Sequence, residues 1–292
     1  MKTMTKQKSF TLIELLVVIV IIGILAGVIM ISTSSSIDKA SFAKAQAFSS
    51  TVKNELFFNL VSEWTFDEPQ QGNITIDSFS NNHGTVYGAT YKTRESGECV
   101  SGGCYSFDGV DDYISISQLL IFDSSFTISM WVNPKMSSSR SILIGDYGFA
   151  NGINVNFEIT SGNKLRWYWN ASPDISGSRN VKINNFNYIV FLRDKEKNKV
   201  YAYIDGILDI NYSGSIVDKN PIDRFYIGRD YRTGETAHNG LIDDVRIYNA
   251  ALSASQIKQN YVAGLNSLLN IGSISKEAYN ERINTLAHEN ND

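Results

Sequence analysis

The pattern of hydrophobic and polar positions divides the chain into three parts, of which the first is helical. Residues 10–31 form an almost unbroken apolar run that contains one carboxylate, Glu14. As a helix this run would be about 33 Å long, enough to cross the core of a bilayer. Between Ile37 and Val61, apolar residues recur at spacings of three and four, which is typical of an amphipathic helix. We therefore predict one long helix over residues 10–61, with a serine-rich stretch near its middle.

The second part begins at Ser62, where the period changes from helical to two. Short segments rich in β-branched and aromatic residues alternate with Gly, Asn, Asp and Ser, without helices between them. This pattern predicts a mainly β domain, an antiparallel sandwich or barrel. The expected strands are Ser62–Phe66, Gly84–Tyr87, Gly103–Phe107, Tyr113–Ile116, Phe126–Asn133, Ser141–Asp146, Ile153–Ile159, Lys164–Trp169, Tyr188–Arg193, Lys199–Ile204, Phe225–Arg229 and Gly240–Tyr248.

The third part is a short helical tail. Ser253 and Gln256 have the spacing of a capping box, and the helix that follows would pack Ile257 and Tyr261 against the β domain. Beyond it, residues 265–287 predict two short helices around the turn at Gly272. The expected organisation is a short basic segment at 1–9, a long helix at 10–61 that begins with the membrane-length run, a β domain at 62–262 and a tail at 263–292.

Composition narrows the classes of partner. The chain has 292 residues, of which 43% are hydrophobic and 12% aromatic, with a formal net charge of −4. The length suits one membrane segment and one domain with a full hydrophobic core. Because no basic stripe appears outside the leader, we expect no nucleic-acid partner.

The amino terminus carries the most specific motif in the chain. A short basic leader ends at Ser9, and the apolar run opens with Phe10-Thr-Leu-Ile-Glu14. This segment resembles the amino terminus of type IV prepilins and of the related pseudopilins. The resemblance implies that a prepilin peptidase cuts between Ser9 and Phe10, that the new amine of Phe10 is methylated, and that Glu14 acts in assembly. Ser9 stands where members of the family usually carry Gly.

The carboxylate of Glu14 has a physical cost that supports this resemblance. A carboxylate near the start of a membrane helix, such as Glu14, costs roughly 2–3 kcal/mol on insertion scales. In pilins the carboxylate is thought to pair with the first amine of a neighbouring subunit, which offsets that cost and fixes the stagger of the subunits. An ordinary secretory signal and a plain membrane anchor are the alternatives, and the plain anchor leaves Glu14 unexplained.

A series of strings in the β domain also resembles a known family. They include Trp64-Thr-Phe-Asp-Glu68, Ser106–Ile114, Phe126–Val132, Tyr201–Gly206 and the closing Gly240–Tyr248. Together they resemble the laminin-G-like, concanavalin A-like jelly roll, over residues 62 to about 262. The resemblance implies a lectin-like antiparallel sandwich on a bacterial surface.

A structural calcium ion is the cofactor that this resemblance implies. Members of the fold often hold Ca²⁺ between the first and last strands, and the closing Ile-Asp-Asp-Val-Arg string places Asp243 as a ligand. Asp67 and Asp77 complete the candidate metal set. Hard cations prefer clustered oxygen ligands of this kind. The alternative is that Asp67 and Asp77 are ordinary turn or cap residues.

The two cysteines, Cys99 and Cys104, flank a four-residue segment. Since the domain is expected outside the cytoplasm, we predict a local disulfide between them; a metal site would need more ligands nearby.

The sequence predicts no enzyme activity. Retaining glycosidases need two carboxyl groups about 5–5.5 Å apart, which jelly-roll glucanases place on one strand in a Glu-x-Asp-x-x-Glu string. Here Glu158 stands alone in its strand, and the three histidines are scattered. Trp167 and Trp169, alternating on one strand, are expected in the core.

Together these features predict a minor, type IV pilin-like subunit that displays a lectin-like domain for adhesion or for binding a glycan or another surface ligand. Its partners would be other pilin-like subunits, the prepilin peptidase and the membrane. It would cross the bacterial cytoplasmic membrane once, with its head outside, and would reach the cell surface or a pilus if assembled. The alternatives are a pseudopilin of a type II secretion or DNA-uptake system and a membrane-tethered glycosidase.

Overall fold

The computed structural model describes residues 58–67, 72–117, 124–135, 140–146, 155–169, 175–214, 224–230 and 236–289, all within the compact unit Leu56–Asp292. The predictions for residues 1–57, namely the leader, the cleavage site, Glu14 and the long helix, lie outside the described residues. Among the residues that are described, no helix is long and apolar enough to cross a membrane.

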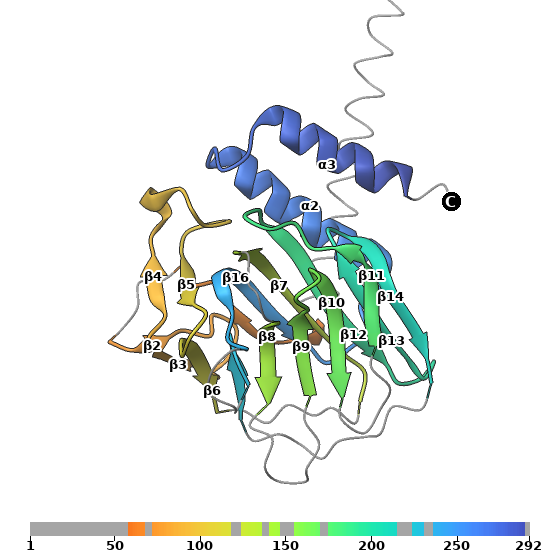
Figure 1. Ribbon diagram of the computed structural model, residues 1–292, viewed down its shortest axis with the longest axis horizontal. Helices are drawn as coiled ribbons and strands as arrows, with labels where there is room; N and C mark the ends of the chain where they lie inside the picture. Colours follow the sequence, from red (N-terminus) through yellow and green to blue (C-terminus); the bar gives the residue numbers. More distant parts are fainter. Residues whose placement is uncertain are drawn as a thin grey trace, which may run out of the picture. The chain divides into compact units, whose positions relative to one another are not determined.

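The described unit is a sandwich of two antiparallel sheets with two helices at the carboxyl end (Figure 1). In the first sheet the strand order is β14 (Ile207–Ser213), β13 (Lys199–Ile204), β12 (Asn187–Asp194), β7 (Phe126–Pro134), β16 (Asn239–Tyr248), β5 (Cys104–Asp108) and β4 (Thr90–Lys92). Strand β1 (Leu60–Trp64) belongs to the same sheet and pairs with β16. In the second sheet the order is β11 (Ile175–Asn180), β10 (Lys164–Trp169), β9 (Val155–Ile159), β8 (Ser141–Asp146), β15 (Phe225–Ile227), β6 (Tyr113–Ile116), β3 (Gly84–Tyr87) and β2 (Ile74–Thr75).

The core lies between the inner faces of the two sheets and follows from the period of two. In β10 the side chains alternate between half-buried and buried, and the buried set contains Trp167 and Trp169. Trp167 meets Phe157 of β9 edge to face at 4.9 Å, and Phe157 packs at the same ring distance on Phe191 of β12 in the other sheet. The prediction that the two tryptophans belong to the core is confirmed.

Each segment predicted to be a strand contains one. The opening strand ends at Trp64, two residues earlier than expected, because Phe66 has a φ of 58° and leaves the extended conformation. Strands β2, β4, β11 and β14 were missed. The missed β14 follows a two-residue turn, Asp205-Gly206, in which both residues have positive φ, a strong hairpin signal.

Helix α2 (Ala254–Asn270) starts at the predicted capping box, since Ser253 and Gln256 bond each other's backbone amides. The helix continues to Asn270, so the expected division between sandwich and tail at residue 262 falls inside it. Helix α3 (Lys276–His288) follows after a short turn and begins at its own N-cap, Ser275.

Helix α2 packs on the outer face of the first sheet. Tyr261 stacks at 5.8 Å on Trp131 of β7, and Ile257 and Leu265 are fully buried. Gly264 lies directly against the indole, where a Cβ atom would come within 2.4 Å of the Trp131 ring. Glycine is therefore required here by close approach of the helix to the sheet.

This contact predicts an inverted effect of a common helix substitution. Replacing a glycine in a helix with alanine usually stabilises by about 0.5–1 kcal/mol. Gly264→Ala should instead destabilise by about 1–3 kcal/mol, because the methyl group overpacks against Trp131. Thermal unfolding measures the change, with Asn266→Ala at an exposed position of α2 as the control. A stability at or above wild type for Gly264→Ala would show that α2 does not dock as described.

Candidate functional site

The disulfide predicted between Cys99 and Cys104 is present, with the two Cα atoms 5.4 Å apart. It closes the loop that joins η1 (Arg94–Ser96) to β5. Both cysteines are fully buried, and the backbone amides of Val100 and Ser101, inside the closed loop, point at the carboxylate of Asp243. The disulfide therefore holds a pair of amide donors against the closing strand.

Asp243 lies at an irregularity of β16, where the register with β7 shifts between Asp243 and Arg246. Its Oδ2 accepts hydrogen bonds from Val100 N at 2.7 Å and Ser101 N at 3.4 Å, and its Oδ1 accepts one from the amide of Asp244. Burial, reinforced by the nearby carboxylates of Asp244 and Asp67, raises the pKa of Asp243 well above its ordinary value.

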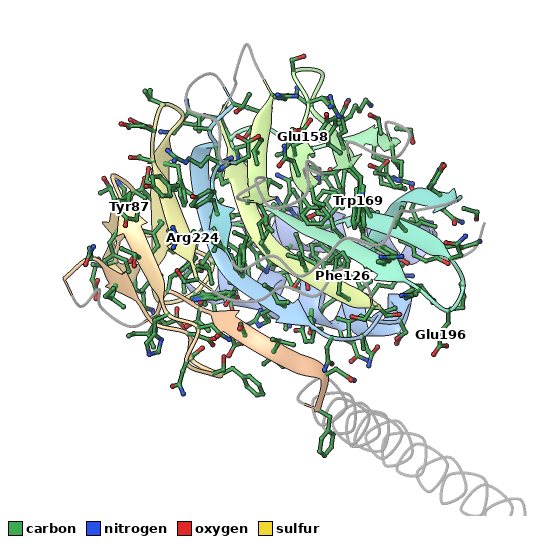
Figure 2. The ribbon with its side chains drawn as sticks, turned by 90° about the horizontal axis from the view of Figure 1, so that it is seen from below. Tyr87, Phe126, Glu158, Trp169, Glu196 and Arg224 are labelled. Atoms are coloured by element: carbon green, nitrogen blue, oxygen red, sulfur yellow. A yellow bond between two sulfur atoms is a disulfide. The ribbon has the colours of Figure 1, made fainter. Side chains whose placement is uncertain are left out.

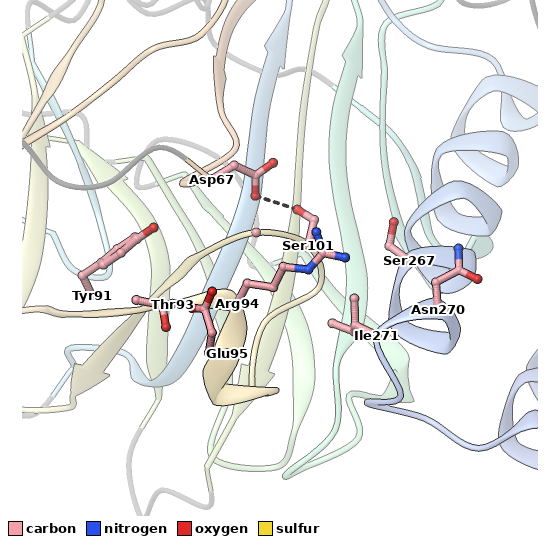
Figure 3. A pocket seen from close by; sticks show the side chains of 10 residues that line it. Asp67, Tyr91, Thr93, Arg94, Glu95, Ser101, Ser267, Asn270 and Ile271 are labelled. Atoms are coloured by element: carbon pink, nitrogen blue, oxygen red, sulfur yellow. Dashed lines mark hydrogen bonds between the residues drawn. The ribbon is translucent and has the colours of Figure 1, made fainter.

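Asp67 reaches the same loop from the segment after β1. Its Oδ1 accepts a hydrogen bond from Ser101 Oγ at 2.9 Å (Figure 3). The same oxygen accepts a second hydrogen bond, from Gly103 N at 3.2 Å. Ser101 thus donates to both carboxylates, so the structure brings together two of the three residues predicted as metal ligands. Sequence position alone gives no sign of this, because Asp67 and Asp243 come from opposite ends of the domain.

The charge around these two carboxylates is unbalanced. Arg246 pairs with Glu63 at 2.6 Å and with Asp244 at 3.1 Å. Among the described residues, no lysine or arginine forms an ion pair with Asp67 or Asp243. Two acidic groups, one of them fully buried, therefore meet at one loop without a paired cation.

Asp77, the third predicted ligand, has a different position and role. Its Oδ1 accepts hydrogen bonds from the amides of Glu63, Phe79 and Ser80, each at 3.0 Å, and its Oδ2 accepts one from Ser80 Oγ at 2.5 Å. These bonds lower the pKa of Asp77 against the opposing effect of burial. Asp77 closes its turn and ties it to β1, which matches the alternative that it is a turn or cap residue.

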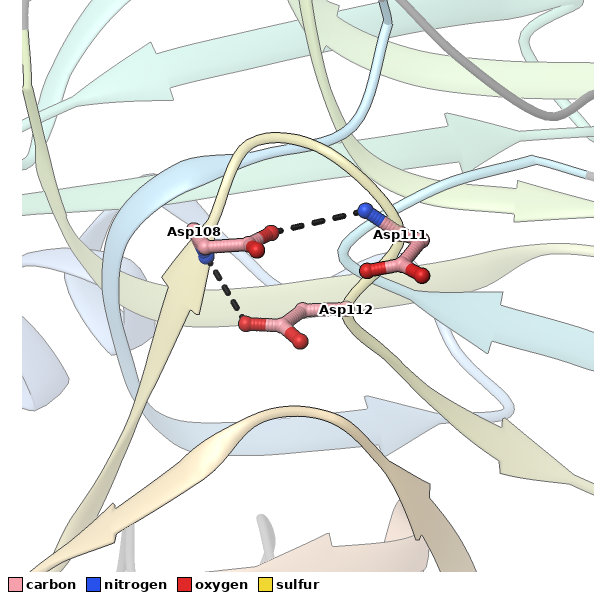
Figure 4. Close-up of side chains that lie close together, drawn as sticks. All are labelled: Asp108, Asp111 and Asp112. Carbon is pink, nitrogen blue, oxygen red and sulfur yellow. Dashed lines mark hydrogen bonds between the residues drawn. The ribbon is translucent and has the colours of Figure 1, made fainter.

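A cluster of three acids, Asp108, Asp111 and Asp112, occupies the turn between β5 and β6, with carboxylate oxygens within 4.8 Å of one another (Figure 4). Asp112 accepts a hydrogen bond from the amide of Asp108, and Asp108 accepts bonds from those of Val110 and Asp111. The cluster is accounted for by the hydrogen bonds that shape this turn.

A pocket of about 620 Å³ opens beside Asp67 (Figure 3). One wall comes from β4, η1 and the disulfide loop, and the other from the last turn of α2. The lining residues are mostly polar: Asp67, Tyr91, Thr93, Arg94, Glu95, Ser101, Gly102, Ser267, Asn270 and Ile271. The volume falls within the range of about 300–1,000 Å³ that is usual for small-molecule sites.

The outer face of the second sheet carries aromatic and polar side chains in register. Tyr87 of β3 stacks on Tyr113 of β6 at 4.5 Å, and the guanidinium of Arg229 lies 3.7 Å from the centre of the Tyr113 ring. Tyr87 is 46% exposed. Further along the sheet, Glu158 of β9 pairs with Arg166 at 3.1 Å. Figure 2 shows Tyr87 and Glu158 at well-separated places on the sandwich.

Ser141 and His238 form a buried polar pair that the sequence did not reveal. Ser141 Oγ lies 2.7 Å from His238 Nδ1, and the two residues are 6% and 0% exposed. The pair links the start of β8 to the segment before β16, and its burial leaves no room for a substrate at the serine. We regard it as structural.

Comparison with known proteins supports both predicted resemblances. Residues 4–30 match the prokaryotic N-terminal methylation motif. Residues 108–258 match the sequence profile of the concanavalin A-like lectin/glucanases superfamily. The chain therefore belongs to the concanavalin A-like superfamily and carries a type IV pilin-type methylation segment. No curated protein sequence matches it.

Solved structures share the fold at low sequence identity. Domain 4 of AbnA, a GH43 extracellular arabinanase from Geobacillus stearothermophilus solved with arabinotriose, aligns with a TM-score of 0.57 and 19% identity, covering 69% of our chain and 97% of that domain. Trypanosoma rangeli sialidase aligns with a TM-score of 0.54 and 16% identity, covering 70% of our chain and 32% of the enzyme. The binding domain of Paraclostridial Mosquitocidal Protein 1 aligns with a TM-score of 0.54 and 18% identity, covering 72% of our chain and 53% of that domain's chain. Our chain thus spans about a third of the sialidase, and these likenesses establish the fold alone.

The buried histidine predicts a pH dependence of stability. Burial lowers the pKa of His238 from 6.5 to about 4, so the folded protein keeps it neutral at a pH where the unfolded chain protonates it. The contribution of neutral His238 to the free energy of unfolding is fully present above the unfolded pKa of about 6.5 and is lost as the pH falls toward 4. Between pH 7 and pH 5 the loss should be about 2 kcal/mol.

Denaturant unfolding of wild type and His238→Asn at both pH values measures this loss, because other titrating groups are common to the two proteins. The variant should be less stable at pH 7 and should lose about 2 kcal/mol less on acidification. Equal losses in the two proteins would show that His238 is not held neutral.

Proposed function

We propose that the chain is a minor, type IV pilin-like subunit that displays its lectin-like domain outside the cell for adhesion through glycans. The observation that carries this proposal is the joining of a methylation motif at residues 4–30 to a concanavalin A-like sandwich. We assign the motif to assembly at a membrane and the sandwich to binding.

The proposal gives the amino-terminal residues defined roles. Prepilin peptidase cleaves between Ser9 and Phe10, the amine of Phe10 is methylated, and the apolar run that follows anchors the chain in the cytoplasmic membrane. Glu14 pairs with the first amine of a neighbouring pilin-like subunit. The disulfide between Cys99 and Cys104 supports an extracytoplasmic position for the domain.

We propose that the domain binds and does not catalyse. Glu158 of β9 and Asp230, in the segment after β15, are buried carboxylates, and each is held by a neighbour: Glu158 by Arg166 at 3.1 Å and Asp230 by the side-chain amide of Asn156 at 3.1 Å. Carboxylates that are buried and already bonded to protein groups suit a structural role better than the roles of general acid and nucleophile in a glycosidase. The arabinotriose in the complex of the arabinanase domain supports saccharide binding by this fold.

We also propose a structural calcium ion held by Asp67 and Asp243. Their fit rests on donor chemistry: two carboxylates that share Ser101, and that form no ion pair with any Lys or Arg in the described part of the chain, are oxygen ligands of the kind that Ca²⁺ prefers. Asp77 is left out, because it lies in a different turn and its hydrogen-bond partners there are not those of Asp67 and Asp243. The ion would supply the positive charge that offsets burial of Asp243 and would join the segment after β1 to β16.

The assembly role of Glu14 predicts a separation of membrane insertion from filament incorporation. Glu14→Ala should leave the chain in the membrane fraction but reduce its share in sheared filaments at least tenfold, because the pair with the neighbouring amine is lost. Immunoblots of the two fractions measure this, with Thr11→Ala as a control in the same segment. Incorporation of Glu14→Ala at the wild-type level would remove the proposed role. A pseudopilin of a secretion or DNA-uptake system would show the same dependence, but in a short periplasmic assembly.

The calcium proposal predicts a metal-dependent rise in melting temperature. Calcium at about 100 times its Kd should stabilise by about 2.7 kcal/mol, or roughly 5–10 °C for a domain of this size. Asp243→Asn should abolish the rise, whereas Asp111→Asn, in the exposed acidic turn, should keep it. Equal shifts on calcium addition in wild type and Asp243→Asn would exclude this site.

A further inference from the structure

The pocket beside Asp67 is built from parts of the chain that are far apart in sequence. Its first wall is the segment from Tyr91 to Gly102, and its second is the end of α2. Ser273 Oγ, in the turn after α2, donates a hydrogen bond of 2.8 Å to the carbonyl of Gly97 and so ties the walls together. The disulfide between Cys99 and Cys104 closes the loop at the end of the first wall. The pocket is therefore largely formed before any ligand arrives.

We propose that this pocket binds a neutral saccharide of about one or two sugar rings, with Arg94 and Asn270 as its principal polar contacts. The inference rests on the proposed function and deepens it, because it assigns the glycan to a place on the domain and to a chemical class. The assigned pocket lies where the sandwich meets the end of α2.

The polar groups of the pocket match the hydroxyl groups of a sugar. A sugar hydroxyl both donates and accepts hydrogen bonds, so a site for it needs donors and acceptors from several directions. Arg94 supplies donors only, and the Asn270 amide supplies both. Figure 3 shows the Arg94 side chain extending from η1 toward the α2 side, with Asn270 and Ser267 on the helix opposite. A ligand between the walls would meet polar groups from both.

The pocket also offers apolar contact for the C–H groups of a sugar ring. Tyr91 and Ile271 are half-buried and stand in different walls. The Tyr91 ring meets Tyr105 edge to face at 5.5 Å, which fixes its orientation. Small-molecule sites commonly combine such apolar surface with a few placed polar groups.

The charge of the pocket favours a neutral ligand over an acidic one. Arg94 and Glu95 in the lining offset each other, and the calcium ion proposed above would compensate Asp67. A carboxylated sugar would therefore find no net positive charge to pair with and would bear the cost of its own desolvation. A neutral sugar meets no such penalty.

The test uses the full-length chain in detergent micelles. Binding to immobilised arabinotriose and maltotriose, both neutral, and to sialyllactose, which is acidic, is measured before and after substitution. Ser267→Trp fills the pocket from α2, and Asn266→Trp makes the same change at the neighbouring exposed position. Arg94→Ala removes a polar contact without filling the pocket. Tyr87→Ala removes the exposed tyrosine of the second sheet, where a competing site would lie.

We expect binding to at least one neutral trisaccharide, weakened about tenfold or more by Ser267→Trp and by Arg94→Ala, and unchanged by Asn266→Trp and Tyr87→Ala. Unchanged binding in both pocket variants, or loss in Tyr87→Ala, would overturn the assignment to this pocket while leaving glycan binding intact. Binding to sialyllactose alone would overturn the neutral class. Absence of binding by the wild-type chain to all three probes would count against the proposed function itself.

Discussion

The structure depends on a change of partner along one strand, β16. Its first half pairs with β5 through residues 239–242, and its second half pairs with β1 through residues 245–248. Asp243 and Asp244 occupy the junction, where Asp244 has a φ of 51°. The amides of the disulfide loop hold the buried Asp243 carboxylate at that point. Opening, closing and disulfide-bearing segments of the domain therefore meet at one buried group, which explains why charge compensation matters there.

The two outer faces of the sandwich differ in what covers them. On the first sheet, Trp131 and Tyr188 point outward and are covered by α2, which needs Gly264 to approach. Because α2 continues to Asn270, its last turn reaches the disulfide loop and forms the second wall of the pocket. The second sheet keeps polar and aromatic side chains outward, from Tyr87 to Glu158. The tail thus covers the first sheet and also contributes one wall of the pocket.

Features of the fold that depend on local sequence could be predicted, whereas those that depend on long-range contacts could not. Alternation along single strands located Tyr113–Ile116 and Lys164–Trp169 correctly, since one buried face dictates the pattern. Strand β11 was missed because Ser-Gly-Ser-Arg in its middle has little strand preference, and pairing with β10 decides its state. Only the resemblance singled out Asp67 and Asp243, and the hydrogen bonds that both make with Ser101 depend on long-range packing. The α2 wall of the pocket was missed, because it depends on how far the helix runs across the sheet.

The central claim is that this lectin-like domain belongs to a processed, pilin-like subunit. Mass spectrometry of the amino terminus of the chain, recovered from the membrane or sheared-filament fraction of the cells that make it, tests that claim most directly. The account predicts a mature chain that begins at Phe10 and carries one methyl group on its amine. A chain that still carries residues 1–9 would contradict it and would leave a tethered lectin-like protein with no assembly role for Glu14.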